Sequence, residues 1–257
     1  MLREWRQRRR LSQLELALAG DTSTRHLSFL ETGRAQPSRT MVLHLAEHLA
    51  VPLRDRNILL TAAGYAPVFA ERRLDHPALA AARRAVDLVL QGHAPYPALA
   101  VDRHWTLIAA NDATGLLLAG VDDALLRPPV NVMRLALHPR GLAPRIANFA
   151  EWRAHLLERL RQQAEASADP VLVGLADELR GYPAPVASGA PRPARDYAGM
   201  IVPLELATDA GVLALFSTVT TFGTPVDVTL SELALECFYP ADAATAEALQ
   251  RRGRTST

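Results

Sequence analysis

The chain of 257 residues contains no lysine, one cysteine and no long apolar run. A lone thiol, Cys237, cannot form an internal disulfide or supply a cysteine-based zinc site. No apolar stretch reaches the roughly 18 residues that a membrane span requires. The basic start, MLREWRQRRR, leads into a capped helix and not into an apolar signal segment. The sequence therefore predicts a cytoplasmic protein with no membrane partner, no metal and no cofactor.

Sequence motifs of catalysis are also missing. The polar clusters at 102–104 and near His138 accompany no nucleophile elbow, no glycine-rich phosphate loop and no metal-ligand spacing. We therefore predict that the protein is not an enzyme. Hydrophobic residues make up 49% of the chain, which is ample for a packed core, and the length favours one large or two modest domains.

The formal net charge of +1 hides an asymmetry along the chain. Residues 1–66 contain ten arginines and six acidic residues, a charge of +4. Residues 67–257 contain eighteen arginines and twenty-one acidic residues, a charge of −3. A basic N-terminal part on a mildly acidic remainder is typical of a nucleic-acid-binding domain joined to a body with another role.

Residues 11–34 predict two short helices joined by a tight turn. Ser12 and Glu15 have the spacing of a capping box, and Ser23 is placed to cap a second helix over 24–31. The outer face of that second helix carries small or hydrogen-bonding side chains, which suit the major groove of DNA. These side chains are Thr24, Arg25, His26 and Ser28.

This stretch resembles the helix-turn-helix of the lambda-repressor/Cro family, also called XRE-type regulators. The residues that carry the resemblance are Leu11-Ser12-Gln13, Leu16-Ala17, Ser23, Leu27-Ser28, Leu30-Glu31, Gly33-Arg34 and Pro37-Ser38. The resemblance implies a bundle of five short helices that binds double-stranded DNA, and we expect a homodimer on a two-fold site. Asp21 stands where the family usually has glycine, and aspartate tolerates left-handed backbone better than most residues.

The predicted DNA contacts follow from this motif. Arg25 is the best candidate for a bidentate contact with guanine, whereas Arg34 and Arg39 suit backbone phosphates. The Gln13 amide could bond a phosphate or support the second helix. The alternative for each residue is an ordinary solvated side chain. The predicted set is Gln13, Ser23, Thr24, Arg25, His26, Ser28, Arg34 and Arg39, with Arg3, Arg6 and Arg8 as further phosphate candidates.

The second half of the chain mixes helices and strands. After a linker over 67–76, the patterns predict a helix over 78–91, a β-hairpin over 98–110 and helices from Pro144 and Asp169. A proline-rich surface loop is predicted over 183–195. Strands follow over 200–207, 212–222 and 233–239, with a final helix from Asp242.

The segment WTLIAAN, residues 105–111, resembles the opening of a PAS-type sensor domain, and residues 77–250 resemble the MmyB-like ligand-binding domain. The second resemblance rests on NVMRLALHPRGLAPRIAN (131–148), Trp152, STVTTFGTPVDVTL (217–230) and FYPAD (238–242). It implies a PAS-like pocket for a fatty-acid-like or other small apolar ligand. The expected architecture is a mainly α, multi-domain chain: an all-α lambda-repressor-like helix-turn-helix bundle (1–66), an α+β PAS-like domain (77–250) and a tail (251–257).

Several polar residues interrupt segments of this domain that otherwise suit burial. A carboxylate-bearing ligand would need a cation or several donors inside an apolar pocket. We therefore predict ligand contacts from Arg134, His138, Arg145 and Asn148, with Trp105, Asn111, Thr220 and Phe222 lining the same pocket. The alternative is that the arginines pair with acidic residues of the protein and that the aromatic residues belong to the core.

The functional hypothesis is a transcriptional regulator whose DNA affinity responds to a small molecule. Two alternatives keep the DNA-binding domain but change the role of the second domain. In one it only dimerises the protein, and in the other it binds a partner protein; neither needs a small ligand. A deep, apolar, enclosed cavity in the second domain would favour sensing, and a filled core would favour the alternatives.

Overall fold

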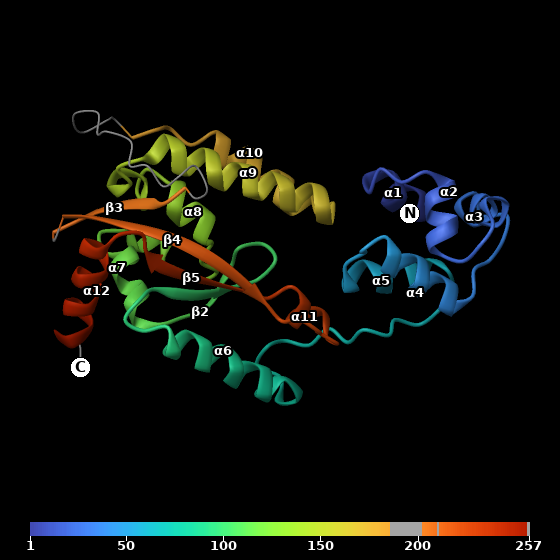
Figure 1. Cartoon of the computed structure of the whole chain (residues 1–257), viewed down its shortest axis with the longest axis horizontal. Helices are drawn as coiled ribbons and strands as arrows, with labels where there is room; N and C mark the ends of the chain where they lie inside the picture. The colour runs from blue at the N-terminus through green and yellow to red at the C-terminus, as the bar shows by residue number, and fades with distance from the viewer. Residues whose placement is uncertain (186–201, 210, 256–257) are drawn as a thin grey trace. The chain divides into compact units, whose positions relative to one another are not determined.

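A computed structural model describes residues 1–185, 202–209 and 211–255 (Figure 1). The chain forms two compact units, which we describe separately. Unit 1 contains residues 1–76 together with 165–168 and 223–231, and unit 2 contains 77–164, 169–222 and 232–257. None of the helices in the described ranges has the length and apolar character that crossing a membrane requires. Most of the predicted proline-rich loop, 186–195, lies outside the described residues.

The N-terminal part of unit 1 is a bundle of five short helices, as predicted. Serine side chains begin three of them: Ser12, Ser23 and Ser38 each accept a hydrogen bond from a backbone N–H three residues later. At Ser12 the bond is reciprocated by Glu15, which completes the capping box. The helices are α1 (Leu2–Arg8), α2 (Gln13–Ala19), α3 (Thr24–Glu31), α4 (Arg39–His48) and α5 (Leu53–Ala62).

The turn between α2 and α3 shows how the departure from the family pattern is accommodated. Asp21 has a φ of 51°, so it adopts the left-handed conformation that glycine adopts without steric cost. The preceding Gly20 is needed for packing, because a Cβ there would lie 2.6 Å from Cδ2 of Leu45. Leu45 belongs to the buried core of the bundle, so the turn is held directly against that core.

Unit 2 is built on a five-stranded antiparallel sheet in the order β2-β1-β5-β4-β3. The predicted hairpin is confirmed by β1 (Ala98–Val101) and β2 (Leu107–Ala110), which pair directly. The later strands are β3 (Leu204–Thr208), β4 (Gly211–Thr221) and β5 (Ala234–Pro240). The sheet with its helices confirms an α+β domain after the helical bundle.

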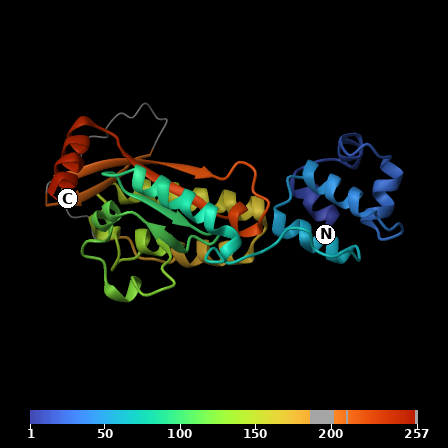
Figure 2. The ribbon, with the colours of Figure 1, turned by 90° about the horizontal axis from the view of Figure 1, so that it is seen from below.

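The two faces of the sheet pack against different helices. Along β1, Leu99 and Val101 belong to one buried cluster, whereas Ala98 and Ala100 belong to another, as the two-residue period of a strand requires. The first cluster includes residues of α8 (Val132–Leu137), α9 (Phe149–Ser167) and α10 (Pro170–Arg180). The second includes Val86 and Leu90 of α6 (Ala80–Gly92), which crosses the sheet in Figure 2.

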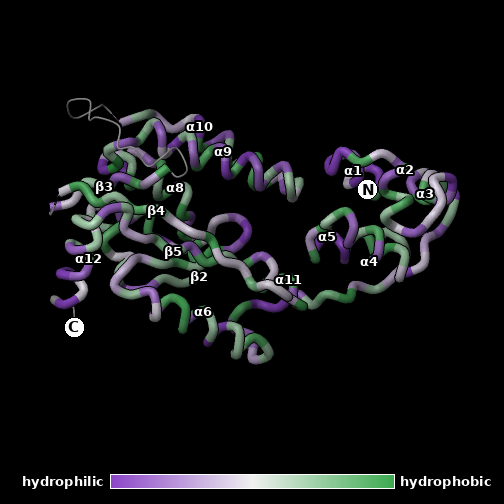
Figure 3. The backbone as a smooth tube through the Cα atoms, in the orientation of Figure 1, coloured by the Kyte–Doolittle hydropathy of each residue, from purple (hydrophilic) through white to green (hydrophobic). Residues whose placement is uncertain are grey.

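The remaining helices of the structure are short, except for the last. They are the 3-10 turns η1 (Pro77–Leu79), η2 (Asp112–Thr114), η3 (Asp123–Leu125) and η4 (Ala143–Arg145), with α7 (Gly115–Leu118), α11 (Val228–Ser231) and α12 (Ala243–Thr255). No pattern in the sequence predicts α11. In Figure 3 hydrophobic and hydrophilic colours alternate along α6 and α9, as expected for helices that bury one face.

The helix predicted from Pro144 begins later than expected. Ile146 forms an isolated antiparallel bridge with Leu206 of β3, and α9 starts only at Phe149. Asn148 holds this arrangement, because its Nδ2 donates to the carbonyl of Pro203 and its Oδ1 accepts from the N–H of Glu205. Residues 146–148 therefore bond to the edge of the sheet, and the helix begins after them.

Candidate DNA-binding helix and candidate ligand cavity

Helix α3 buries one side in the bundle and leaves the other accessible. Leu27 is fully buried, whereas Thr24 and Arg25 are exposed and His26 is half-buried. The guanidinium of Arg25 lies over the Phe29 ring, 5.5 Å from its centre. The aromatic contact orients a cationic side chain on the accessible face of the helix, where a base or a phosphate could meet it.

A nearly buried ion pair supports the C-terminal end of α3. Arg6 Nε and Nη2 donate to the two carboxylate oxygens of Glu31 at 2.6 and 2.9 Å, and Gln13 Nε2 donates to the same carboxylate at 2.8 Å. The side chains of Arg6 and Glu31 are only 10% and 1% exposed. Burial alone would raise the pKa of Glu31, but the hydrogen bonds from Arg6 and Gln13 outweigh it and hold the pKa below its ordinary value.

This ion pair bears on the roles expected for Gln13 and Arg6. Gln13 supports the second helix of the motif through Glu31. Arg6, expected as a phosphate candidate, is 8% exposed and committed to Glu31 and to the carbonyl of Leu11, so that expectation was wrong. Arg34 and Arg39 are exposed, as phosphate contacts require, and Ser28 is half-buried. Ser23 serves as the cap of α3, which leaves its side chain at the start of that helix.

Unit 2 contains an apolar cavity of about 70 Å³ between the sheet and its covering helices. Helices α7, α8 and α9 and strands β1, β2, β3 and β5 contribute to its wall. Its lining is aliphatic and aromatic apart from Thr114 and Glu236. Leu99, Trp105, Leu117, Met133, Trp152, Leu156 and Phe238 are among the apolar lining residues.

The cavity is small for a ligand site. One water molecule occupies about 30 Å³ of the liquid, whereas small-molecule pockets usually enclose about 300–1,000 Å³. A volume of about 70 Å³ therefore matches a few methylene groups and not a whole ligand. A larger apolar molecule would have to displace lining side chains, and the single-turn helix α7 and the short helix α8 provide part of that lining.

One carboxylate faces this apolar space. Glu236 is 6% exposed, and its Oε1 accepts from Arg159 Nη1 at 2.7 Å and from Ser217 Oγ at 2.8 Å. The guanidinium of Arg159 also lies over the Trp105 ring, 4.4 Å from its centre. Arg159 thereby neutralises the buried carboxylate and is itself held in place by an aromatic face.

The two tryptophans of the cavity differ in their hydrogen bonding. Trp105 Nε1 donates to Gln163 Oε1 at 2.7 Å. Trp152 is 4% exposed, and its Nε1 is the one buried side-chain nitrogen or oxygen without a partner in the described part of the chain. An unpaired buried donor is uncommon in folded proteins, and each case requires an explanation.

Comparison with protein families places both parts of the chain. Residues 2–55 match the helix-turn-helix family, and residues 82–251 match the MmyB-like transcription regulator ligand binding domain. The chain belongs to the MmyB-like transcription regulators. Its N-terminal bundle is an XRE-type DNA-binding domain, and its second domain is a ligand-binding domain. A comparison with curated proteins found no match.

In this MmyB-like regulator, Arg134 is paired outside the cavity. Arg134 Nη2 lies 2.7 Å from Glu178 Oε2, and the Tyr182 hydroxyl donates to the same carboxylate. Burial, followed by the bond to Glu178, raises the pKa of Tyr182 to about 12. His138 packs edge-on against Tyr182, and its Nδ1 accepts from the N–H of Arg140. These residues form a polar cluster away from the cavity lining.

Arg145 and Asn111 are also engaged by the protein. Arg145 donates to the backbone carbonyls of Leu116, Leu117, Ala119 and Ala207, and burial lowers the pKa of its guanidinium. Asn111 Nδ2 donates to the carbonyls of Leu90 and Tyr96, while its Oδ1 accepts from the Ala98 N–H and from Thr114 Oγ1. Both side chains connect segments that are distant in sequence.

The lining of the cavity therefore differs from the set predicted from sequence. Trp105 lines it, whereas Arg134, His138, Arg145, Asn148 and Asn111 bond elsewhere in unit 2. Thr220 is exposed on β4, and Phe222 packs against the cluster on the opposite face of the sheet. Sequence reasoning missed Glu236, although a single acid within the apolar strand LALECFYP was a usable signal.

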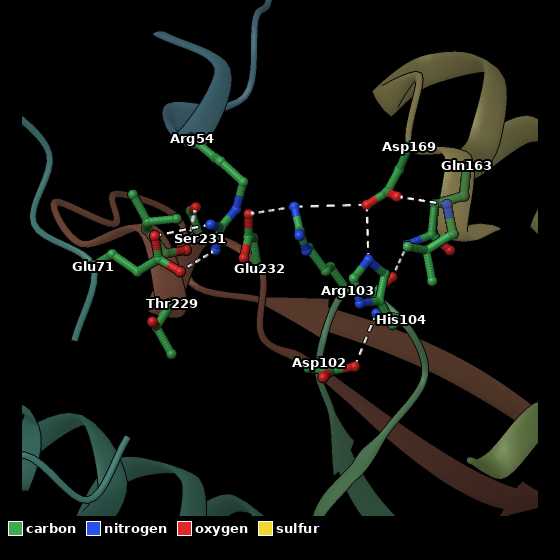
Figure 4. Close-up of polar contacts among 12 residues, drawn as sticks. Arg54, Glu71, Asp102, Arg103, His104, Gln163, Asp169, Thr229, Ser231 and Glu232 are labelled. Carbon is green, nitrogen blue, oxygen red and sulfur yellow. Dashed lines mark hydrogen bonds and ion pairs between the residues drawn. The ribbon is translucent and has the colours of Figure 1, made fainter. Parts of the chain in front are cut away.

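The polar segment Asp102-Arg103-His104 has a structural role at the end of the hairpin (Figure 4). Asp102 Oδ1 accepts from the N–H groups of His104 and Thr106, which closes the turn. His104 Nε2 lies 2.8 Å from Asp169 Oδ2, and the Arg103 guanidinium lies 3.6 Å from the same oxygen. Asp169 also caps α10, so this cluster fastens the hairpin to the start of that helix.

Proposed function

We propose that this MmyB-like regulator binds a two-fold operator as a homodimer and that a small apolar, acyl-type ligand in the cavity of unit 2 modulates its operator affinity. Support for the DNA half comes from the exposed Thr24 and Arg25 on α3 and from the charge of residues 1–66. One such bundle makes few base contacts, so two half-sites about one helical turn apart supply useful specificity. We also infer from its DNA-binding domain that the regulator acts in the cytoplasm.

Support for the ligand half comes from the apolar cavity of unit 2, which is the single observation that carries this proposal. The alternative is that the second domain is only a dimerisation or protein-partner module. A domain with that role has no need of apolar space beside a buried, unpaired indole N–H. The proposal predicts a shift in operator affinity on adding a ligand, and the alternative predicts none.

The DNA half is tested with Arg25→Ala. Loss of a bidentate base contact should cost about 1–3 kcal/mol at the preferred site and relax the sequence preference there. Fluorescence anisotropy on a selected operator and on single-base variants measures both effects. The matched control is Arg84→Ala, which removes an exposed arginine from α6. An unchanged base preference in Arg25→Ala would contradict the assignment of Arg25.

The ligand half is tested by extracting molecules that copurify with the full chain and identifying them by mass spectrometry. The extracted class should then raise the melting temperature and alter operator affinity. A ligand at one hundred times its Kd stabilises the folded state by about 2.7 kcal/mol, which corresponds to roughly 5–10 °C for a protein of this size. A melting temperature and an operator affinity that do not respond to any acyl compound would favour the alternative.

A further inference from the structure

The electrostatics of the cavity bear on the head group of the ligand. Among the described residues that line the cavity, Glu236 is the one with a charged side chain. A free carboxylate placed there would meet a second carboxylate in a medium of low polarity, where like charges repel strongly. The nearby cation, Arg159, is already bonded to Glu236 and stacked on Trp105.

The cations that could have received an anionic head are committed elsewhere. Arg134 is paired with Glu178, and Arg145 donates to four backbone carbonyls. Neither side chain lines the cavity. A carboxylate head would therefore have to break the Arg159–Glu236 pair, which would leave a nearly buried charge unpaired.

One residue that lines the cavity carries a donor without an acceptor. Trp152 lines the cavity, is 4% exposed, and has an indole N–H without a hydrogen-bond partner. The bond that Trp105 makes to Gln163 has no counterpart at Trp152. A neutral carbonyl oxygen accepts such a bond without bringing a charge toward Glu236.

We propose that the ligand is a neutral carbonyl compound with an apolar tail, such as a ketone, ester or lactone, and that Trp152 Nε1 donates to its carbonyl oxygen. This inference rests on the proposed ligand-binding function and narrows it to a chemical class. It replaces the anionic head expected from the sequence. The tail occupies the apolar space, and the carbonyl satisfies the orphan donor.

The test compares three six-carbon probes, 2-hexanone, hexanoate and hexane, on the full chain at pH 7. Binding is followed by NMR through the indole N–H signals of the three tryptophans, which Trp→Phe variants assign. The ketone should bind about fivefold more tightly than hexane and shift the Trp152 signal, because one neutral hydrogen bond is worth about that factor. Hexanoate should bind more weakly than the ketone.

Three variants sharpen the comparison. Trp152→Phe keeps an aromatic ring but removes the donor, so the advantage of 2-hexanone over hexane should vanish. Trp5→Phe makes the same change in the bundle core, and the advantage should persist. Glu236→Gln removes the repelling charge and releases Arg159, so hexanoate should gain about tenfold relative to the ketone.

The outcomes separate the two proposals. Tighter binding of hexanoate than of 2-hexanone by the unmodified protein overturns the head-group assignment but leaves a ligand cavity. The same holds if the ketone binds without moving the Trp152 signal. If none of the three probes binds, the cavity is not a ligand site, and the proposed ligand control falls together with this inference. The comparison of probes on the unmodified protein stands even if a variant fails to fold.

Discussion

Replacing Arg6 with methionine should destabilise the DNA-binding bundle far more than a surface substitution would. The variant removes both hydrogen bonds that Arg6 makes to Glu31 and leaves a carboxylate whose side chain is 1% exposed with only Gln13 as a side-chain partner. Breaking a buried pair in this way costs about 3–5 kcal/mol. A bundle of this size has a stability of roughly 3–10 kcal/mol, so most of it could be lost.

The double variant Arg6→Met/Glu31→Leu provides the matched control. Replacing both partners with apolar residues removes the uncompensated charge, so the double variant should recover most of the loss. Urea unfolding followed by circular dichroism, together with operator binding, measures the bundle in each variant. If the double variant were as unstable as the sum of two damaging single changes, the reasoning from an unpaired buried charge would be refuted.

The same pair predicts how acid affects the bundle. Because the folded protein holds the pKa of Glu31 below its ordinary value, the ionised form is favoured by folding. This contribution is fully present above the unfolded pKa of a glutamate, about 4.3, and is lost as the pH falls through the folded pKa. The Glu31→Gln variant should lack this part of the acid dependence.

Three further predictions concern single residues. Arg39→Ala should flatten the slope of log affinity against log salt concentration by about 0.9 without changing operator preference, as expected for one phosphate contact; parallel slopes with equal affinity would show that Arg39 only faces solvent. Asp227 is 1% exposed and pairs with Arg72 at 3.0 Å, so Asp227→Ala should weaken hydrogen-exchange protection of its neighbour Val228 by about tenfold or more. Asn111→Ala leaves several backbone groups without their partner and should lower the stability of unit 2 by at least about 2 kcal/mol in thermal unfolding.

Features that depend on neighbouring residues could be predicted from the sequence. The capping box at Ser12, the cap at Ser23, the helix start at Asp169 and the hairpin over 98–110 all appear as expected. Each is set by residues within a few positions of one another, so the chain itself carries the whole signal. The start of α9 could not be placed, because it depends on the bridge between Ile146 and Leu206, which are distant in sequence.

The polar residues of the candidate ligand site could not be interpreted from the sequence either, because their partners are distant in sequence. A polar residue within an apolar segment must be satisfied by something, and the sequence alone cannot distinguish an internal partner from a ligand. Arg134 finds Glu178, which lies 44 positions away, and Glu236 finds Arg159, which lies 77 positions away. Once these partners are known, the residues that looked most like ligand contacts are accounted for within the protein.

The indole N–H of Trp152 distinguishes the candidate ligand site better than the polar residues that the sequence singles out. Trp152 has no charge and lies within a helix, so its sequence context is that of an ordinary core residue. Only the hydrogen-bond inventory of the folded protein separates it from Trp105, whose indole is satisfied by Gln163. An unpaired donor on a residue that lines an apolar cavity can be satisfied by a neutral hydrogen-bond acceptor. The proposed neutral head group therefore rests on the donor that the protein leaves without a partner, and not on the arginines that it has already paired.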